Sequence, residues 1–260
     1  MTLQINLNSD LGEAFGAWPM GDDEAMLDLV ATANIACGFH AGDPLVMTRT
    51  VRAALAKGVG IGAHPGYPDL QGFGRRPMTL SAEEIEAIIV YQVGALAGIA
   101  GACGGRVGHV KPHGALNNLA AVDHDAALAV ARAVARSAGA AGGGLVLLAP
   151  AGSAMVAAGR ALGLTVAEEV YADRAYDDDA NLVPRSHPRA MIGDAAEAAA
   201  NVLRMVKAGT LRSINGKEIA CRVQSVSVHG DDPDAVALAR SLRGGLAAAG
   251  VAVVPLAAMV

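Results

Sequence analysis

Short apolar segments alternate with longer amphipathic ones along almost the whole chain. The apolar segments are bounded by Gly, Pro, Asn or Asp and have the length of β-strands. They cover residues 3–10, 31–40, 58–64, 106–113, 144–150, 164–174 and 224–231, and a shorter one follows at 251–256. The amphipathic segments have helical periodicity and cover residues 44–57, 81–101, 123–138, 194–209 and 234–250.

Two of the expected helices have clear start signals. Pro44 suits a first helical turn, and the carboxylate of the preceding Asp43 can cap the helix. Ser81 and Glu84 have the spacing of a capping box. Both helices are therefore predicted to begin at these residues.

Strands that alternate with helices predict a parallel sheet covered by helices, because each helix returns the chain to the same end of the sheet. A barrel of this kind needs about 250 residues, and the chain has 260. We therefore predict an α/β fold, a distorted TIM-like (β/α)7 barrel, as a single domain over residues 1–260. An open, doubly wound sheet is the alternative.

The composition argues against several classes of protein. The net charge of −5 and the lack of a basic cluster argue against nucleic acid as a partner. No apolar run has the length of about 18 residues typical of a membrane span, and residues 142–159 come closest. Three widely spaced cysteines form neither a disulfide framework nor a zinc motif, and the acidic N-terminal region does not resemble a secretory leader. These features predict a cytoplasmic protein without a membrane partner.

Polar residues stand where the predicted strands end. They are Asp10, His40, His64, His113, Glu168 or Glu169, and His229. In folds with parallel strands, the active site lies at the carboxyl ends of the strands. Each residue alone is also explained as a cap or a loop residue. Their repetition predicts one shared cavity at the mouth of the barrel.

Two kinds of chemistry suit this set of residues. Asp10, His40 and His64 can hold a divalent metal that polarises a carbonyl group and activates water. Without a metal, the same groups can act as general acid and base on an amide. Lys111, held beside Pro112, is expected to direct its charge toward the mouth, where it can stabilise an oxyanion or hold a carboxylate.

Two other chemistries have little support. The chain has no GxxxxGK[ST] motif, and GVGIGA at residues 58–63 enters a strand, whereas a dinucleotide-binding turn leaves one. Cys37 and His40 are three residues apart at a strand end and are expected to face different ways. A thiol nucleophile is therefore not expected.

Seven short motifs resemble one known family. They are LNSDLGEAFG, ANIACGFHAGDP, GVGIGAHPGYPD, GFGRR, HVKPHGALNN, EEVYADRAY with LVPRS, and VHGD, in this order from about residue 5 to residue 231. Together they are similar to the LamB/YcsF family of 5-oxoprolinase A subunits. The resemblance implies a barrel of the glycoside hydrolase/deacetylase type. It also implies ATP-dependent opening of 5-oxo-L-proline to L-glutamate, together with partner subunits B and C.

The same motifs carry the site residues that the resemblance implies. Catalytic roles are expected for Asp10, Glu13, Lys111, His113, Glu169 and His229, and substrate binding for Asn34, His40, His64, Arg75, Arg174 and Asp231. ATP is implied as a co-substrate. Because the chain has no recognisable nucleotide loop, we expect the partner subunits to activate the lactam carbonyl and this chain to open the ring with water.

Two other functions stay open at this point. A stand-alone metal-dependent deacetylase or amidohydrolase fits the barrel and the Asp/His set without partners. A non-catalytic binding or scaffold barrel fits the fold alone. A homo-oligomer is compatible with each of the three functions.

Overall fold

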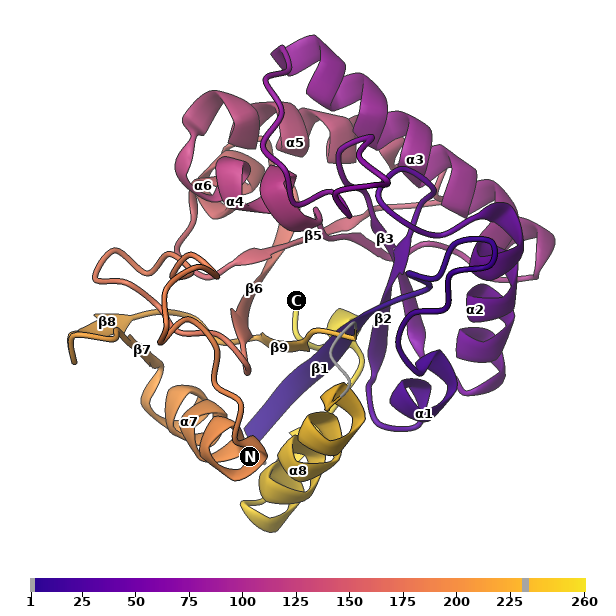
Figure 1. Cartoon of the computed structure of the whole chain (residues 1–260). Helices are drawn as coiled ribbons and strands as arrows, with labels where there is room; N and C mark the ends of the chain where they lie inside the picture. Colours follow the sequence, from indigo (N-terminus) through magenta and orange to yellow (C-terminus); the bar gives the residue numbers. More distant parts are fainter. Residues whose placement is uncertain (1–2, 231–233) are drawn as a thin grey trace.

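Seven parallel strands close into a barrel in the computed structural model of the chain, which describes residues 3–230 and 234–260 (Figure 1). The strands are β1 (Leu3–Leu11), β2 (Thr32–Ala36), β3 (Gly60–His64), β4 (His109–Val110), β5 (Val146–Pro150), β6 (Thr165–Tyr171) and β9 (Ser225–Val228). They follow one another around the ring, and β9 closes it by pairing with both β6 and β1. The closed ring confirms the predicted TIM-like barrel and excludes the open sheet.

β1 pairs with two different strands on the side away from β2. Its beginning pairs with β10 (Val251–Val253) in the register Leu3↔Val251, and its later part pairs with β9 in the register Asn6↔Ser225. The short strand predicted near residues 251–256 is thus confirmed as an addition to the barrel. The antiparallel hairpin of β7 (Thr210–Arg212) and β8 (Glu218–Ala220) lies outside the ring and was not predicted (Figure 1).

Helices surround the barrel (Figure 1). They are α1 (Asp23–Leu27), α2 (Pro44–Ala56), α3 (Ala82–Ala102), α4 (Gly114–Val122), α5 (His124–Ser137), α6 (Ala154–Ala161), α7 (Ala195–Ala208), α8 (Ala235–Ala248) and the 3₁₀-helix η1 (Leu256–Ala258). The Asp43 side chain accepts from backbone N–H groups in the first turn of α2. Ser81 and Glu84 form the capping box of α3. Both predicted helix starts are confirmed.

By length and composition alone, α3 is apolar enough to cross a membrane, with a mean hydropathy of 1.6. The sequence pattern had pointed to residues 142–159 as the most membrane-like segment, and that segment divides into β5, a turn and α6. In the barrel, α3 packs against α5, and its Ile85, Ile89, Val93 and Leu96 are buried. Packing of this face explains much of its apolar character.

Four barrel strands end three or four residues earlier than predicted, and β6 and β9 are two of them, ending at Tyr171 and Val228. β2 ends at Ala36 and β4 at Val110, so His40 and His113 lie in the loops that follow. Gly38, with a φ of 97°, takes the chain out of the extended conformation after β2. Pro112 has no N–H group to continue the ladder after β4. Both histidines nevertheless lie at the carboxyl ends of the strands.

The interior of the barrel is lined by polar side chains. Because side chains alternate along a strand, Asn6, Asn8 and Asp10 of β1 point inward. Ser225 of β9 forms hydrogen bonds with Asn6 and Asn8, and Ser227 accepts one from Lys111. All of these residues are buried. Barrels of this class are more often filled by Val, Ile and Leu. Here a hydrogen-bonded interior supports the residues at the mouth.

Candidate active site at the barrel mouth

A cavity of about 670 Å³ opens at the carboxyl ends of the strands. The predicted residues that line it are Asp10, His64, Arg75, Lys111, His113, Arg174 and His229. Glu13, Asn34, His40 and Glu169 are buried, and each contacts a lining residue. Asp231 lies outside the described residues. The structure thus brings the rest of the predicted set to one end of the barrel.

Lys111 and two carboxylates form a buried ion group. Lys111 Nζ donates to Asp10 Oδ1 at 2.9 Å and lies 3.5 Å from Glu169 Oε2. Burial alone would lower the pKa of Lys111, but Asp10 and Glu169 outweigh it and raise the pKa above its usual value. Burial would raise the pKa of Asp10, but His64 and Lys111 hold that pKa well below its usual value. Lys111 and Asp10 therefore stay charged inside the barrel.

Lys111 lines the cavity at the mouth, and several acceptors hold its ammonium group. It also donates to Ser227 Oγ at 2.8 Å and Asn8 Oδ1 at 3.4 Å, and the residue is 1% exposed. An ammonium group has three N–H donors, and Asp10, Ser227, Asn8 and Glu169 share them. These contacts hold the Asp10 and Glu169 carboxylates in place, and the role of Lys111 toward the substrate stays a prediction.

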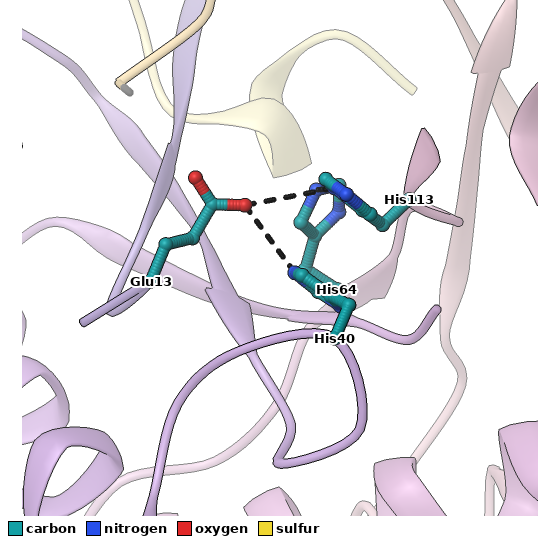
Figure 2. Close-up of side chains that lie close together, drawn as sticks. All are labelled: Glu13, His40, His64 and His113. Atoms are coloured by element: carbon teal, nitrogen blue, oxygen red, sulfur yellow. Dashed lines mark hydrogen bonds and ion pairs between the residues drawn. The ribbon is translucent and has the colours of Figure 1, made fainter. Parts of the chain in front are cut away.

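Glu13, His40, His64 and His113 form a second buried group, in which one ligand atom from each lies within 4.8 Å of the others. Figure 2 shows the Glu13 carboxylate directed at His40 and His113, with the His64 ring behind them. Glu13 Oε1 lies 3.3 Å from His40 Nε2 and 3.5 Å from His113 Nδ1. Burial is the main cause that lowers the pKa of both His40 and His113. Neutral rings keep their lone pairs for a ligand.

Two backbone carbonyl groups determine how His64 and His113 face each other. His64 Nδ1 lies 2.7 Å from the Lys111 carbonyl oxygen, and His113 Nε2 lies 2.8 Å from the Phe73 carbonyl oxygen. A carbonyl oxygen only accepts, so these two nitrogens carry protons. The remaining nitrogens, His64 Nε2 and His113 Nδ1, are 2.9 Å apart with their lone pairs directed at each other. This contact is stable only with a positive charge, a proton or a metal ion, between or beside them.

The donor types of this group fit a metal ion. Imidazole nitrogens and a carboxylate oxygen are common zinc ligands. His64 is nearly perpendicular to the other two rings, but His40 and His113 stack in parallel with centroids 3.7 Å apart. Because a metal binds along the in-plane lone pair of an imidazole, an ion held by all four residues requires one stacked ring to tilt.

The composition of this group differs from the predicted metal set of Asp10, His40 and His64. Asp10 Oδ2 lies 3.3 Å from His64 Nε2, but Asp10 Oδ1 accepts hydrogen bonds from Lys111 and Asn34. Glu13 supplies the carboxylate of the group instead. Gly66 makes room for the His40 ring of this group, because a Cβ atom at Gly66 would lie 2.7 Å from His40 Nδ1.

A histidine and a carboxylate form a separate pair on another part of the cavity wall. His229 Nδ1 donates to Asp173 Oδ2 at 2.6 Å, and the His229 side chain is 13% exposed. Tyr171 stacks on His229 and contacts Lys111, and its hydroxyl donates to Glu169 Oε1 at 2.8 Å. A histidine oriented by a carboxylate through Nδ1 presents Nε2 as a proton acceptor.

Arginine side chains supply positive charge to the cavity. Arg75, Arg174 and Arg185 line it. Arg174 is 5% exposed and donates through Nη2 to the Val183 carbonyl oxygen, while its Nε is buried without a hydrogen-bond partner. Burial, with Arg185 nearby, lowers the pKa of Arg174. A buried guanidinium donor beside a second cation is suited to an anionic ligand.

Cys37 has no role in this site. Its thiol donates to the Ile35 carbonyl oxygen, and burial raises its pKa to about 12. The thiol therefore stays protonated, in agreement with the expectation that it is not a nucleophile. The three cysteines are free.

Several residues of the site were missed in the sequence. They are Asn8, His109, Tyr171, Asp173, Arg185 and Ser227. Most of them lie two or four residues from a predicted site residue on the same strand. The period of two along a strand was the signal that would have found them.

Known proteins are similar to this chain in sequence and in fold. The LamB/YcsF family model matches residues 5–260. The 5-oxoprolinase A subunit of Azoarcus sp. (strain BH72) is 58% identical over 248 residues, which are 95% of this chain and 95% of the relative. The crystal structure of a lactam utilization protein from Thermus thermophilus is 43% identical, with a TM-score of 0.89, over 97% of this chain and 99% of that one.

A more distant structure shares the fold alone. A T48 deacetylase bound to its substrate is 16% identical, with a TM-score of 0.52, over 99% of this chain and 90% of that one. The barrel is therefore of the deacetylase type, as the resemblance implied. The full-length family match and the high identity to its relatives show that the chain belongs to the LamB/YcsF family.

Proposed function

We propose that this chain is the A subunit of a 5-oxoprolinase, which opens 5-oxo-L-proline to L-glutamate with ATP hydrolysis and acts together with subunits B and C. The observation that carries the proposal is the full-length similarity, at 58% identity, to a relative named as the A subunit of 5-oxoprolinase. The similar structure named a lactam utilization protein supports the same class of substrate.

The charges of the cavity suit this substrate. 5-Oxo-L-proline combines a cyclic amide with one carboxylate. Arg174 offers a buried, unpartnered Nε–H group, and Arg75 and Arg185 add positive charge to the same wall. The substrate carboxylate would bind at these arginines, and the lactam would then lie toward Asp10 and His64.

Ring opening requires a base for water and an acid for the leaving nitrogen. The water oxygen bonds to the lactam carbonyl carbon, the C–N bond breaks, and the nitrogen takes up a proton. Asp10 Oδ2, which lies 3.3 Å from His64 Nε2 at the cavity, would accept the proton of the water. His229, oriented by Asp173, would exchange the proton with the ring nitrogen.

The dependence on ATP would come from the partner subunits. Hydrolysis of a five-membered lactam is unfavourable enough to require coupling, and the chain has no P-loop motif. Subunits B and C would activate the carbonyl group, and the barrel would supply the residues that open the ring.

A divalent metal fits the same site. Glu13, His40, His64 and His113 would hold it. When bound, such an ion supplies Lewis-acid polarisation and a more acidic water. Asp10 would orient the water from the other side of His64.

The metal group also favours a second candidate function, a stand-alone metal-dependent deacetylase or amidohydrolase. Such an enzyme needs the metal group but neither ATP nor partners. Its substrate would be an uncyclised amide.

An assay of glutamate formation from 5-oxo-L-proline separates the two functions. The purified chain is tested alone, with subunits B and C, and with both subunits but without ATP. Turnover only in the complete, ATP-containing mixture supports the proposal. Hydrolysis of simple amides by the chain alone, abolished by a chelator and restored by zinc, would support the second candidate instead.

A further inference from the structure

A row of side chains crosses the barrel just below the mouth. The strand registers pair Asp10 with Asn34, Asn34 with Gly62, and Gly62 with His109. These residues therefore lie at one level on four adjacent strands, from β1 to β4. All three side chains of the row are buried.

Gly62 allows His109 to reach across a strand. His109 Nε2 lies 2.7 Å from Asn34 Oδ1, although β3 separates their two strands. A Cβ atom on Gly62 would lie only 1.9 Å from His109 Nε2. The imidazole thus occupies the space that any other residue at position 62 would fill.

The direction of the hydrogen bonds in this row is determined at His109. Asn34 Nδ2 donates to Asp10 Oδ1 at 2.8 Å and to Asn8 Oδ1 at 2.7 Å. Both acceptors carry no hydrogen, so Asn34 needs its NH₂ group on that side and its carbonyl oxygen on the other. The N–H group of His109 satisfies this oxygen. A reversed amide would place an oxygen against the Asp10 carboxylate.

The row also connects to the other charged groups of the site. Asn8 Oδ1 accepts from Lys111 Nζ, and Asn8 Nδ2 lies 3.3 Å from Glu169 Oε2. One oriented chain of amides therefore contacts Asp10, Lys111 and Glu169 together.

We propose that His109 is a positioning residue for the reaction, which acts through Asn34 to orient the Asp10 carboxylate toward His64, in the space that Gly62 leaves. This inference rests on the proposed function for its effect on turnover. His109 lines a separate cavity of about 520 Å³ and does not line the cavity at the mouth, so its contact with the site runs through Asn34.

The test compares four variants in the complex reconstituted with subunits B and C. His109→Ala removes the donor, His109→Gln restores an N–H donor, and Gly62→Ala displaces the imidazole. Gly60→Ala is the matched control, because a Cβ atom there, two residues earlier on the same strand, meets its nearest neighbour at an ordinary 3.5 Å.

The expected result is a loss of kcat of roughly tenfold or more in His109→Ala and Gly62→Ala, with KM changed less than threefold, because supporting residues of this kind contribute about 10- to 100-fold. His109→Gln should recover part of kcat, and Gly60→Ala should match the wild type. The double variant, with both Gly62→Ala and His109→Ala, should have a kcat close to that of His109→Ala alone. If His109→Ala keeps kcat within twofold, or if KM rises in place of a fall in kcat, the inference is wrong.

A second measurement does not depend on turnover. The side-chain NH₂ resonances of Asn34 in the isolated, ¹⁵N-labelled chain, assigned with Asn34→Asp, should shift in His109→Ala and Gly62→Ala but not in Gly60→Ala. If the resonances shift but the wild-type complex shows no turnover, the proposed function is wrong and the positioning of Asn34 by His109 is retained. Unchanged Asn34 resonances in both variants would overturn the positioning role of His109, whatever the activity.

Discussion

The mouth of the barrel has two regions that use the same residue types in different surroundings. In the Glu13–His40–His64–His113 group the side chains are at most 4% exposed, and Glu13 lies against both His40 and His113. In the His229–Asp173 pair one imidazole has its own carboxylate and is 13% exposed. The first region can hold a positive charge that stays in place, whereas the second can exchange a proton with a bound ligand. Changes in the buried region should affect folding and metal binding, and changes in the pair should affect only the rate.

The largest expected effect is that of Lys111→Met on stability. The substitution leaves Asp10 and Glu169 buried without their common cation, and breaking a buried ion pair typically costs about 3–5 kcal/mol in the free energy of unfolding. Urea denaturation of the isolated chain measures it. Lys57→Met is the control, since Lys57 pairs with the exposed Asp28 on the surface and should change stability by less than about 1 kcal/mol. If both substitutions lowered the free energy of unfolding equally, the buried ion group would contribute no more to stability than the surface pair.

Asp173→Asn should change the rate with little change in stability. An asparagine can donate to His229 Nδ1, which favours the wrong tautomer and removes the acceptor at Nε2. We expect turnover of the reconstituted complex to fall on the order of a hundredfold or more, with the thermal midpoint nearly unchanged. Asp179 lines the same cavity but is exposed, so Asp179→Asn should keep the turnover of the wild type. If Asp173→Asn lowered the thermal midpoint strongly and the folded fraction kept its turnover, Asp173 would be a structural residue.

The pH dependence of stability should show the burial of His109. Burial lowers the pKa of His109 to about 3. The unfolded chain, with a usual histidine pKa of about 6.5, then binds more protons than the folded one, so stability falls as the pH drops below that value. Between pH 7 and pH 5 the wild type should lose about 2 kcal/mol more than His109→Gln. Parallel curves for the wild type and His109→Gln would show that His109 is not buried in its neutral form.

The smallest expected effect concerns metal affinity. The wild-type chain should bind about one zinc ion, and Glu13→Gln should weaken binding by roughly tenfold or more, because it removes the only carboxylate of the four-residue group. Isothermal titration with zinc after chelator treatment measures both. Asp173→Asn should bind zinc as the wild type does. Zinc binding that depends on Asp173 and not on Glu13 would reverse the roles of the two regions.

Local patterns were enough to predict the barrel, and the ends of β1, β3 and β5 to within one residue. The capping residues of α2 and α3, the alternation of strands and helices and the polar residues after each strand are encoded over a few neighbouring positions. The alternation of side chains along a strand holds a further prediction. Glu169, Tyr171 and Asp173 share one side of β6 and its extension, whereas Glu168 faces Arg160 on the other side, so the choice between the two glutamates was already present in the pattern.

What the sequence determined by itself was the order of elements, the end of the barrel that carries the site, and the family to which its motifs are similar. Only the tertiary structure decided which groups meet. The grouping of Glu13 with three histidines, the hydrogen bond from Lys111 to Asp10, and the space at Gly62 that admits His109 all join segments far apart in the chain. The physical reason is that strand register and ring closure set these distances, and both depend on the packing of the whole barrel and not on any short stretch of residues.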